Sequence, residues 1–292
     1  MIKLHPFVVT ATTAAFLAGA SILAPAQAEI QVLDFENDAF GNALSGGTQV
    51  NDQWADWGLS ITGKNYKTGQ NNAPLLLYDT SKSGADNDLR TGANWGTPNQ
   101  GNALIIQEYN NNSYNLDTPD DEASGGHIWF KFDQKVGFNQ FSLLDIDDNF
   151  GIQSGTQVRV IGKDADNNQV LNINVDNLIK RFANKYSDPD HSKSQGQSLT
   201  HAYKNSLGEY VDVTITQVGN KRDDNSMFQF DFDETELQRV QFRYSGVSGA
   251  ISGLQWDDLT PEEIPQLPEP SITIGLAMIG FAGARKLLKT SH

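Results

Sequence analysis

The sequence predicts an all-β protein, an antiparallel β-sandwich of the jelly-roll kind, carried between an N-terminal signal peptide and a single C-terminal membrane-spanning helix. Short runs of apolar and β-branched residues recur along the body of the chain. Clusters of Gly, Asn, Asp and Pro separate these runs, and no long segment has a strong helical period. This spacing is typical of sandwiches and jelly rolls.

The expected strands have alternating or β-rich sequences. They fall at 31–35, 59–62, 75–78, 103–107, 127–132, 138–147, 157–162, 170–175, 210–217, 227–232, 237–244 and 250–256. Residues 163–169 have the composition of a hairpin turn. Segment 176–209 does not follow this pattern of strands and turns. We expect it to be an insertion with one short helix in a sandwich domain over residues 29–258.

The charge of the chain is unevenly distributed. Four of the 21 Lys and Arg residues lie in the two end segments, which hold no acid, so residues 29–270 carry 17 bases against 36 acids, a net charge of −19. Such a body repels phosphate groups, which predicts that nucleic acid is not a partner. The chain has no cysteine, so a core or bound ions must stabilise it.

The N-terminus has the layout of a secretory signal peptide over residues 1–28. Lys3 precedes an apolar stretch at 7–23, and Pro25 then leads to Ala26-Gln27-Ala28. A positive start, an apolar middle and a small-x-small ending predict cleavage after Ala28 and therefore an exported protein. An uncleaved membrane anchor is the alternative.

The C-terminus has a second apolar segment. A linker rich in Pro and Glu at 259–270 leads to residues 271–284, which are uncharged and mostly apolar, and a basic tail follows at 285–289. Fourteen helical residues rise about 21 Å, short of a hydrocarbon core of about 30 Å, but two leucines in the tail extend the run and its bases can snorkel. We therefore expect a single membrane-spanning helix within 271–292, with a core helix of a soluble domain as the alternative.

Residues 267–292 combine Pro268-Glu269-Pro270 with the short apolar segment and the basic tail. This combination resembles the PEP-CTERM sorting signal of exported bacterial proteins, although two leucines interrupt the basic cluster. The resemblance implies that Pro268, Glu269 and Pro270 are recognised by an exosortase, a membrane protease, while the helix holds the protein in the membrane. It also implies exopolysaccharide as a partner, and a location at the cell surface or outside the cell after processing.

Acidic residues at the first and last strands suggest a calcium site. Asp34 and Glu36 are two residues apart, so on one strand they share a face, and Asp257 lies in the last strand. Calcium binds six to eight oxygens from carboxylates and carbonyls. The arrangement resembles the structural calcium site of galactose-binding-like carbohydrate modules. An acidic edge that resists strand pairing is the alternative interpretation.

A second cation site depends on how two strands pair. If strands 127–132 and 138–147 form a hairpin across 133–135, the acidic clusters before the first and after the second lie at the same end. The candidate ligands there are Asp120, Asp121, Glu122, Asp145 and Asp147. Solvated loop acids are the alternative.

Aromatic residues in or beside loops suggest a sugar-binding surface, because sugar rings have an apolar face and hydroxyl-rich edges. The candidates for ligand contact are Trp54, Trp57, Tyr78, Trp95 and Tyr109, with Tyr66 and Tyr114 nearby in sequence. For Trp54 and Trp57 a place in the core is an equally good interpretation, and Trp129 and Trp256 are expected in the core.

Catalytic motifs are weak. The chain has no His-x-x-x-His pair and no Gly-x-Ser-x-Gly elbow, and we assign no catalytic residue, although Glu108 and Glu122 are a conceivable carboxylate pair. The sequence favours a non-catalytic, exported module that binds polysaccharide with structural calcium. A carbohydrate-active enzyme, such as a glycoside hydrolase or lyase, and a purely structural envelope or adhesion protein are the alternatives.

Overall fold

The structure, a computed structural model, describes residues 30–82, 86–146, 157–219 and 225–259. These ranges belong to one compact unit, Ala28–Thr260. The expected signal peptide, the linker from residue 260 and the sorting helix with its basic tail lie outside the described residues, as do Ala26, Ala28, Pro268, Glu269 and Pro270. Within the described ranges, no helix has the length and apolar character needed to cross a membrane.

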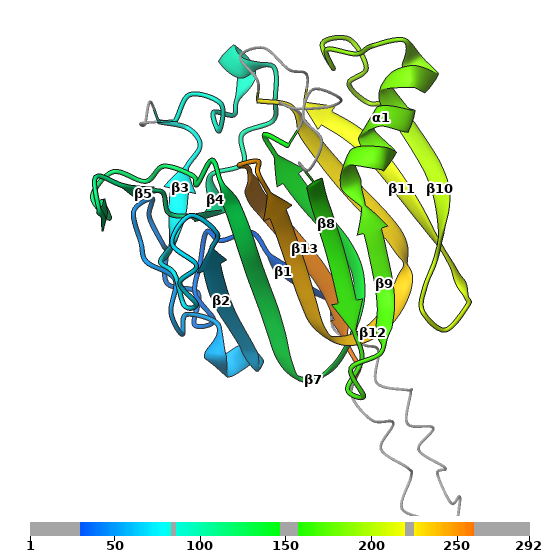
Figure 1. The fold of residues 1–292 in the computed structure, drawn as a ribbon, viewed down its shortest axis with the longest axis horizontal. Helices are drawn as coiled ribbons and strands as arrows, with labels where there is room; N and C mark the ends of the chain where they lie inside the picture. The colour runs from blue at the N-terminus through cyan, green and yellow to red at the C-terminus, as the bar shows by residue number, and fades with distance from the viewer. Residues whose placement is uncertain (1–29, 83–85, 147–156, 220–224, 260–292) are drawn as a thin grey trace, which may run out of the picture. The chain divides into compact units, whose positions relative to one another are not determined.

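The body consists of antiparallel strands and one α-helix, which confirms the predicted all-β class (Figure 1). The strands are β1 (Ile30–Leu33), β2 (Leu59–Asn65), β3 (Leu75–Asp79), β4 (Asn102–Ile106), β5 (Tyr109–Asn110), β6 (Ser113–Tyr114), β7 (Gly125–Leu144), β8 (Gln157–Lys163), β9 (Gln169–Asn174), β10 (Ser198–Lys204), β11 (Tyr210–Gly219), β12 (Met227–Ser245) and β13 (Ala250–Asp258). The helix is α1 (Val175–Tyr186), and two 3-10 turns are η1 (Ala55–Trp57) and η2 (Ala93–Trp95).

Two long strands, β7 and β12, run through both layers of the sandwich. In a first layer, residues 125–132 of β7 pair with β2 on one side and with residues 239–245 of β12 on the other. Residues 239–245 of β12 also pair with β8, which pairs with β9 at the edge of this layer. The other halves of β7 and β12 pair with β11 and β13 in a second layer, which continues to β10, β1, β4 and β3. The core lies between the layers: the rings of Phe141 and Phe242, one from each layer, are 5.3 Å apart.

The prediction that residues 127–132 and 138–147 form a hairpin is wrong, because residues 127–132 and 138–144 belong to the single strand β7. Register shifts between β12 and β7 accompany the bend, as β-bulges do. Since β7 folds over from one layer to the other, its ends nevertheless return to the same end of the sandwich. Gly249 N donates a hydrogen bond of 2.6 Å to Asp121 Oδ2, and a Cβ at Gly249 would lie 2.7 Å from the main-chain oxygen of Asp145.

Helix α1 contacts strands of both layers, β8 in the first and β10 and β11 in the second. The side chain of Asn174 caps its N-terminus by accepting a hydrogen bond of 3.0 Å from Asn177 N. Its apolar face is buried, and Phe182 packs edge-on against Phe228 of β12 with ring centres 5.7 Å apart. The segment predicted to be an insertion therefore contributes to the core.

From Gly126 to Phe132, buried and more exposed residues alternate along β7. Ile128, Phe130 and Phe132 are buried, which turns Trp129 to the outer face, where it is only partly buried. The expectation that Trp129 belongs to the core is wrong: because neighbouring residues of a strand point to opposite faces of the sheet, the inward-facing Ile128 and Phe130 place Trp129 on the outer face. Trp256 is fully buried, as expected.

Candidate functional site

The outer face of the first layer presents three cross-strand rows of side chains. The first row is Lys64, His127, Arg243, Arg159 and Asn174; the second is Thr62, Trp129, Gln241, Ile161 and Asn172; the third is Ser60, Lys131, Arg239, Lys163 and Gln169. We call this surface the basic sheet face. It contains six Lys and Arg residues and no Asp or Glu, in a chain whose body is strongly acidic.

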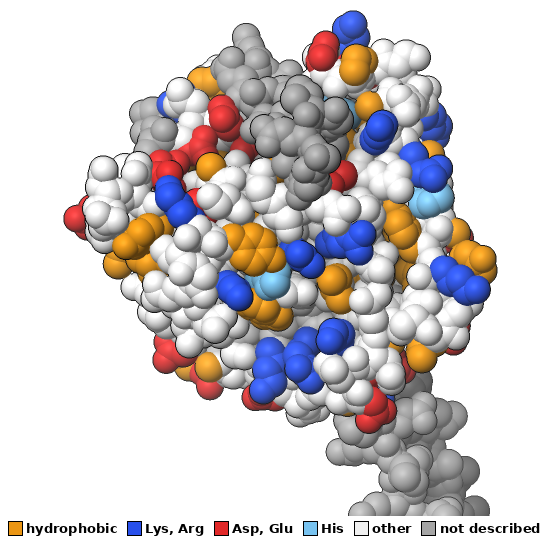
Figure 2. All heavy atoms as spheres, in the orientation of Figure 1, with side chains coloured by type: hydrophobic (Ala, Val, Ile, Leu, Met, Phe, Trp, Pro, Cys, Tyr) orange, Lys and Arg blue, Asp and Glu red, His pale blue; other side chains and the backbone are white. Residues whose placement is uncertain are grey.

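The cations of the basic sheet face form two groups, one in the first row and one in the third. Figure 2 shows Lys and Arg side chains gathered in two groups over the middle of this face, with hydrophobic side chains and a histidine between and beside them. Asp and Glu side chains lie toward the margins of the view. The central row is uncharged, so two lines of positive charge flank a neutral strip.

Like charges stand directly opposite each other across neighbouring strands. Arg239 pairs in register with both Lys131 and Lys163, and Arg243 pairs with Arg159. Such contacts destabilise a sheet by about 0.2 to 1 kcal/mol each. None of the six bases forms an ion pair with a carboxylate of the described residues. Asp176 of α1 interacts electrostatically with one of them: burial raises the pKa of Asp176 to about 6, and the charge of Arg159 partly opposes this rise.

An aromatic group lies where the first two rows meet. His127 packs edge-on against Tyr66 and Trp129, with ring centres 4.9 and 4.7 Å away. Its ring nitrogens hydrogen-bond the Tyr66 hydroxyl and, at 2.8 Å, Gln241 Nε2. Burial, followed by the charges of Arg243 and Lys64, lowers the pKa of His127 to about 4. The group therefore offers apolar ring surface and fixed polar atoms between cations.

Two of the predicted sugar-contacting residues are core residues. Trp54 is 1% exposed, donates from Nε1 to Asn37 O at 2.9 Å, and packs edge-on against Phe35. Tyr78 is 2% exposed on β3. Neither offers a ring to a ligand, so the prediction is wrong for both: Trp54 packs into the main core, and Tyr78 belongs to a second buried cluster on the other face of β3.

The other three predicted contacts, Trp57, Trp95 and Tyr109, are partly exposed but have different neighbours among the described residues. Trp57 packs against Trp256, and Trp95 lies under the Arg90 guanidinium, 4.8 Å from its ring centre. Tyr109 packs against Tyr114 in the β5–β6 hairpin, with ring centres 5.0 Å apart. The aromatic surface that does form was missed because it depends on the register of β7 with its neighbours.

A second polar site, the acidic triad, consists of Asp86, Asp120 and Asp121. One carboxylate oxygen from each lies within 4.8 Å of the others. Burial, followed by the charges of Asp86 and Glu108, raises the pKa of Asp120 to about 6. Burial and the charge of Asp86 also hold the pKa of Asp121 well above its usual value. The space that the three carboxyl groups share therefore disfavours the charged forms of Asp120 and Asp121.

Two tyrosine hydroxyls face the acidic triad. The Tyr78 hydroxyl donates to the main-chain oxygen of Asp86, and burial with the charge of Asp86 raises its pKa to about 12. Tyr244 is 1% exposed, and its hydroxyl has no hydrogen-bond partner among the described residues. Burial, followed by the charges of Asp121 and Asp145, raises the pKa of Tyr244. Carboxylate and hydroxyl oxygens, the atom type that hard cations bind, are therefore gathered in this part of the structure.

The remaining predicted ligands of this second site have other roles. Glu122 is buried, and its carboxylate accepts hydrogen bonds from Asn65 Nδ2 at 2.8 Å and from the main-chain nitrogens of Tyr109 and Ser124, both at 3.1 Å. These donors fix a loop, so the prediction of Glu122 as a ligand is not supported by its contacts. Asp145 is buried directly after β7, and Asp147 lies outside the described residues.

The predicted site at Asp34, Glu36 and Asp257 does not form. Strand β1 ends at Leu33, so Asp34 and Glu36 lie in a turn and not on one strand face, and Asp34 Oδ1 accepts from Glu36 N at 3.0 Å. Asp257 is opposite Ile30, at the other end of β1.

The side chains of Glu36 and Asp257 are also engaged elsewhere. Glu36 Oε1 accepts a hydrogen bond of 2.5 Å from Asn102 N, and Asp257 Oδ2 accepts one of 3.1 Å from Asn139 Nδ2. The separation and these contacts make the prediction wrong for this set.

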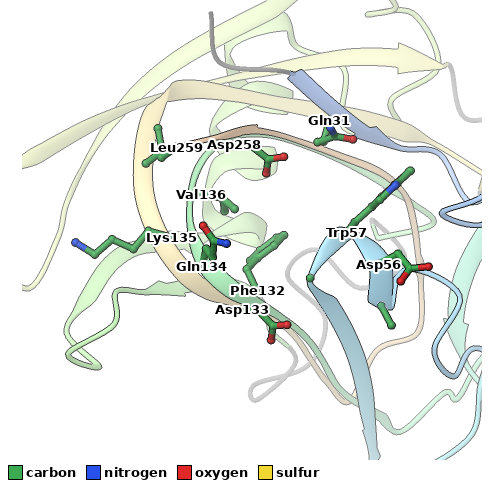
Figure 3. Close-up of a pocket in the computed structure, with 12 residues that line it drawn as sticks. Gln31, Asp56, Trp57, Phe132, Asp133, Gln134, Lys135, Val136, Asp258 and Leu259 are labelled. Carbon is green, nitrogen blue, oxygen red and sulfur yellow. The ribbon is translucent and has the colours of Figure 1, made fainter. Parts of the chain in front are cut away.

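A pocket of about 500 Å³ lies at the bend of β7 (Figure 3). Its polar lining includes Asp56, Asp133 and Asp258, and Trp57 and Phe132 supply aromatic surface. Trp256 Nε1 donates to Asp258 Oδ1 at 3.3 Å. The pocket therefore combines carboxylates with an indole ring, a composition that sequence patterns did not indicate.

No protein-family model matches the chain, and no curated protein matches it. A solved structure similar to it is CBM32-3 from a family 31 glycoside hydrolase from Clostridium perfringens. The two are 11% identical, the match covers 62% of this chain and 93% of that one, and the TM-score is 0.22. This similarity is too low to support an inference about function, which has to come from the sites themselves.

Proposed function

We propose that the sandwich is a non-catalytic polysaccharide-binding module and that the basic sheet face is its ligand surface. The observation that carries the proposal is the arrangement of the three rows: Trp129 and Ile161 give apolar surface, and Gln241 gives an amide in the same row. Sugar rings have an apolar face and hydroxyl edges, and such side chains match both. The strands fix these positions, so little ordering is needed on binding.

The acidic triad is proposed as the calcium site of this module. Asp86, Asp120 and Asp121 supply carboxylate oxygens, and the buried Tyr244 hydroxyl, which is subject to the charge of Asp121, has no partner among the described residues. Calcium would favour the charged carboxylates that burial disfavours. It would also join the loop of Asp86 to the loop before β7, which is a structural role.

The location proposed for the module is outside the cell membrane. Its support is the sequence alone: the signal-peptide layout of 1–28 and the PEP-CTERM-like ending of 267–292. An exosortase-type protease and the membrane would then be partners of the C-terminal segment. A pulse-chase experiment with an epitope inside the body tests this: loss of both end segments is expected, and retention of Met1 would contradict it.

The binding function is tested with the full chain in a non-ionic detergent against a panel of soluble polysaccharides. Binding is expected to at least one of them, and Trp129→Ala is expected to weaken it about tenfold, which corresponds to a loss of about 1.4 kcal/mol. The control is Trp95→Ala, which removes a partly exposed Trp remote in sequence from the face. Equal loss in both variants would contradict the proposal.

A carbohydrate-active enzyme is the second candidate, and the pocket at the β7 bend is the observation that favours it. Asp56, Asp133 and Asp258 line it beside Trp57. Two carboxyl groups held about 5 to 10 Å apart can cleave a glycosidic bond. Release of reducing ends that Asp133→Asn and Asp258→Asn abolish, without loss of polysaccharide binding, would establish this function in place of the non-catalytic one.

A further inference from the structure

We propose that the basic sheet face selects an acidic polysaccharide, a chain of sugar rings that carry carboxylate or sulfate groups. The anion contacts are the cations of the first and third rows, and the sugar rings lie along the neutral row between them. This inference rests on the proposed function, because it specifies the ligand class of that same site.

The first argument is the sign of the charge. The body has more than twice as many acids as bases, yet the basic sheet face holds six bases and no acid. Lys131, Arg239 and Lys163 occupy consecutive positions on three neighbouring strands, at a cost in sheet stability. A face kept solely for solubility has no need of this arrangement, because interspersed acids would relieve the repulsion. A bound polyanion removes it.

The second argument is the spacing. Neighbouring strands are about 4.8 Å apart, and side chains on one face recur every second residue, about 7 Å along a strand. A chain lying across the strands on the neutral row therefore has three cations at steps of about 5 Å on its third-row side, about 7 Å away. On its first-row side, also about 7 Å away, Arg243 and Arg159 are on neighbouring strands and His127 separates Arg243 from Lys64. Arg243, Arg159 and Arg239 also present guanidinium forks, which bind carboxylate and sulfate oxygens in pairs.

The third argument concerns the centre of the face. Trp129 offers ring surface, while Thr62 and Gln241 offer a hydroxyl and an amide in the same row. These groups suit a ligand with apolar ring faces and many hydroxyl groups. Burial is the main cause of the lowered pKa of His127, and the positive charges of Arg243 and Lys64 lower this pKa further. An anion would fill this electropositive position.

Nucleic acid is a poorer match. Duplex DNA carries one negative charge per about 1.7 Å of axis, and it extends beyond the face over an acidic body that repels it. An acidic polysaccharide carries its charges more sparsely and separates them with hydroxyl-bearing rings. A second copy of the chain would bring acidic surface, but no line of hydroxyl groups for the neutral row.

The test uses the full chain and matched probes. One pair is polygalacturonate and its highly methyl-esterified form, which share a backbone and differ in charge. Alginate and dextran sulfate extend the acidic set, dextran extends the neutral set, and oligothymidylate represents nucleic acid. The variant is the triple change Lys131→Gln, Lys163→Gln and Arg239→Gln. The control triple is Lys180→Gln, Lys193→Gln and Arg181→Gln, which removes the same charge from exposed positions outside the face.

The expected result is at least tenfold tighter binding to an acidic glycan than to its neutral counterpart, with affinity falling as salt rises. The variant triple is expected to weaken binding about tenfold, at about 0.5 kcal/mol per lost contact, and the control triple less than twofold. Equal binding of neutral and acidic glycans, insensitive to salt but lost in Trp129→Ala, would overturn the inference and leave the proposed function intact.

Three other outcomes are decisive. Failure to bind any glycan of either set would overturn the proposed function together with the inference. Tighter binding of oligothymidylate than of every acidic glycan, abolished by the variant triple, would assign the face to nucleic acid and overturn the inference. Sedimentation that shows a dimer dispersed by the variant triple, without glycan binding, would assign the face to self-association.

Discussion

Lys131 of β7 and Arg239 of β12 lie directly opposite each other in the first layer, and both side chains are on the outer face. The same strands place buried Phe130 and Val240 in register on the inner face. Apolar packing on one side therefore holds two cations together on the other. At this position the apolar contact stabilises the sheet, while the repulsion between the two cations destabilises it.

Lys131→Glu is expected to stabilise the protein by about 0.5 to 1 kcal/mol, because it converts a like-charge pair into an ion pair across the strands. Urea unfolding measures this change. The matched control is Lys135→Glu, which removes an exposed pair, Lys135 Nζ to Glu236 Oε2 at 3.7 Å, and is expected to be neutral or destabilising. A loss of stability in Lys131→Glu would show that repulsion on the face is already relieved.

Two tryptophan substitutions separate core from ligand surface. Trp54→Ala is expected to cost about 3 to 5 kcal/mol, because Trp54 is fully packed and loses its hydrogen bond to Asn37 O. Trp129→Ala is expected to cost much less, since Trp129 is only partly buried on the outer face, while glycan binding falls. Denaturant unfolding and affinity measurements on both variants check this, and the reverse ranking of stability costs would contradict the assignment of faces.

The strand pattern was predictable, but the layers were not. Period-two alternation located most strands within one to three residues, because a half-buried strand has to alternate. It also broke β7 and β12 in two at the polar residues of their bends, such as Asp133 and Asp233. Sequence alone does not reveal whether a polar interruption ends a strand or turns it from one layer into the other.

The sites were predictable only in part. Asp120 and Asp121 were identified from their charge, but Asp86 was missed because its proximity arises from contacts distant in the sequence. The basic sheet face was missed entirely, since its rows join residues from β2, β7, β8 and β12. Each of these strands contributes one or two cations, and only the register brings them together.

The protonation of His127 is expected to report ligand binding. Its pKa of about 4 lies below the usual value of 6.5. Between pH 6.5 and pH 4 the imidazole is therefore protonated in the unfolded chain but neutral in the folded one, so the free energy of unfolding decreases as the pH falls toward 4. An acidic glycan favours the charged imidazole and is expected to raise this pKa, as an NMR titration of the ring would show. His201 on β10, outside the face, is the internal control and is expected to be unaffected. A glycan that binds and leaves the His127 titration unchanged would place the ligand elsewhere.

Calcium is expected to reverse the pH dependence of the acidic triad. Because the folded pKa of Asp120 is raised to about 6, protonation favours the folded state as pH falls from about 6 toward 4. Calcium favours the ionised form, so the rise in melting temperature that it causes should be largest near pH 7.5 and disappear near pH 5. Thermal unfolding with calcium or EDTA checks this. Asp86→Asn should remove the response and Asp34→Asn should retain it; a response equal in both variants would exclude the triad.

Tyr244→Phe is expected to change stability in opposite directions with and without calcium. Without calcium, the substitution removes a buried hydroxyl that lacks a partner among the described residues, and leaving such a group unsatisfied costs about 1 to 3 kcal/mol. The variant should then be more stable than the natural chain. With calcium, the hydroxyl is expected to be a neighbour of the cation, and its loss should weaken calcium binding and cancel the gain in stability.

Tyr78→Phe is the matched comparison, because its hydroxyl already donates to Asp86 O and its loss should destabilise the protein in both conditions. If Tyr244→Phe gave the same gain with calcium as with EDTA, the hydroxyl would not face the cation, and the triad would have to bind it through carboxylates and main-chain oxygens alone.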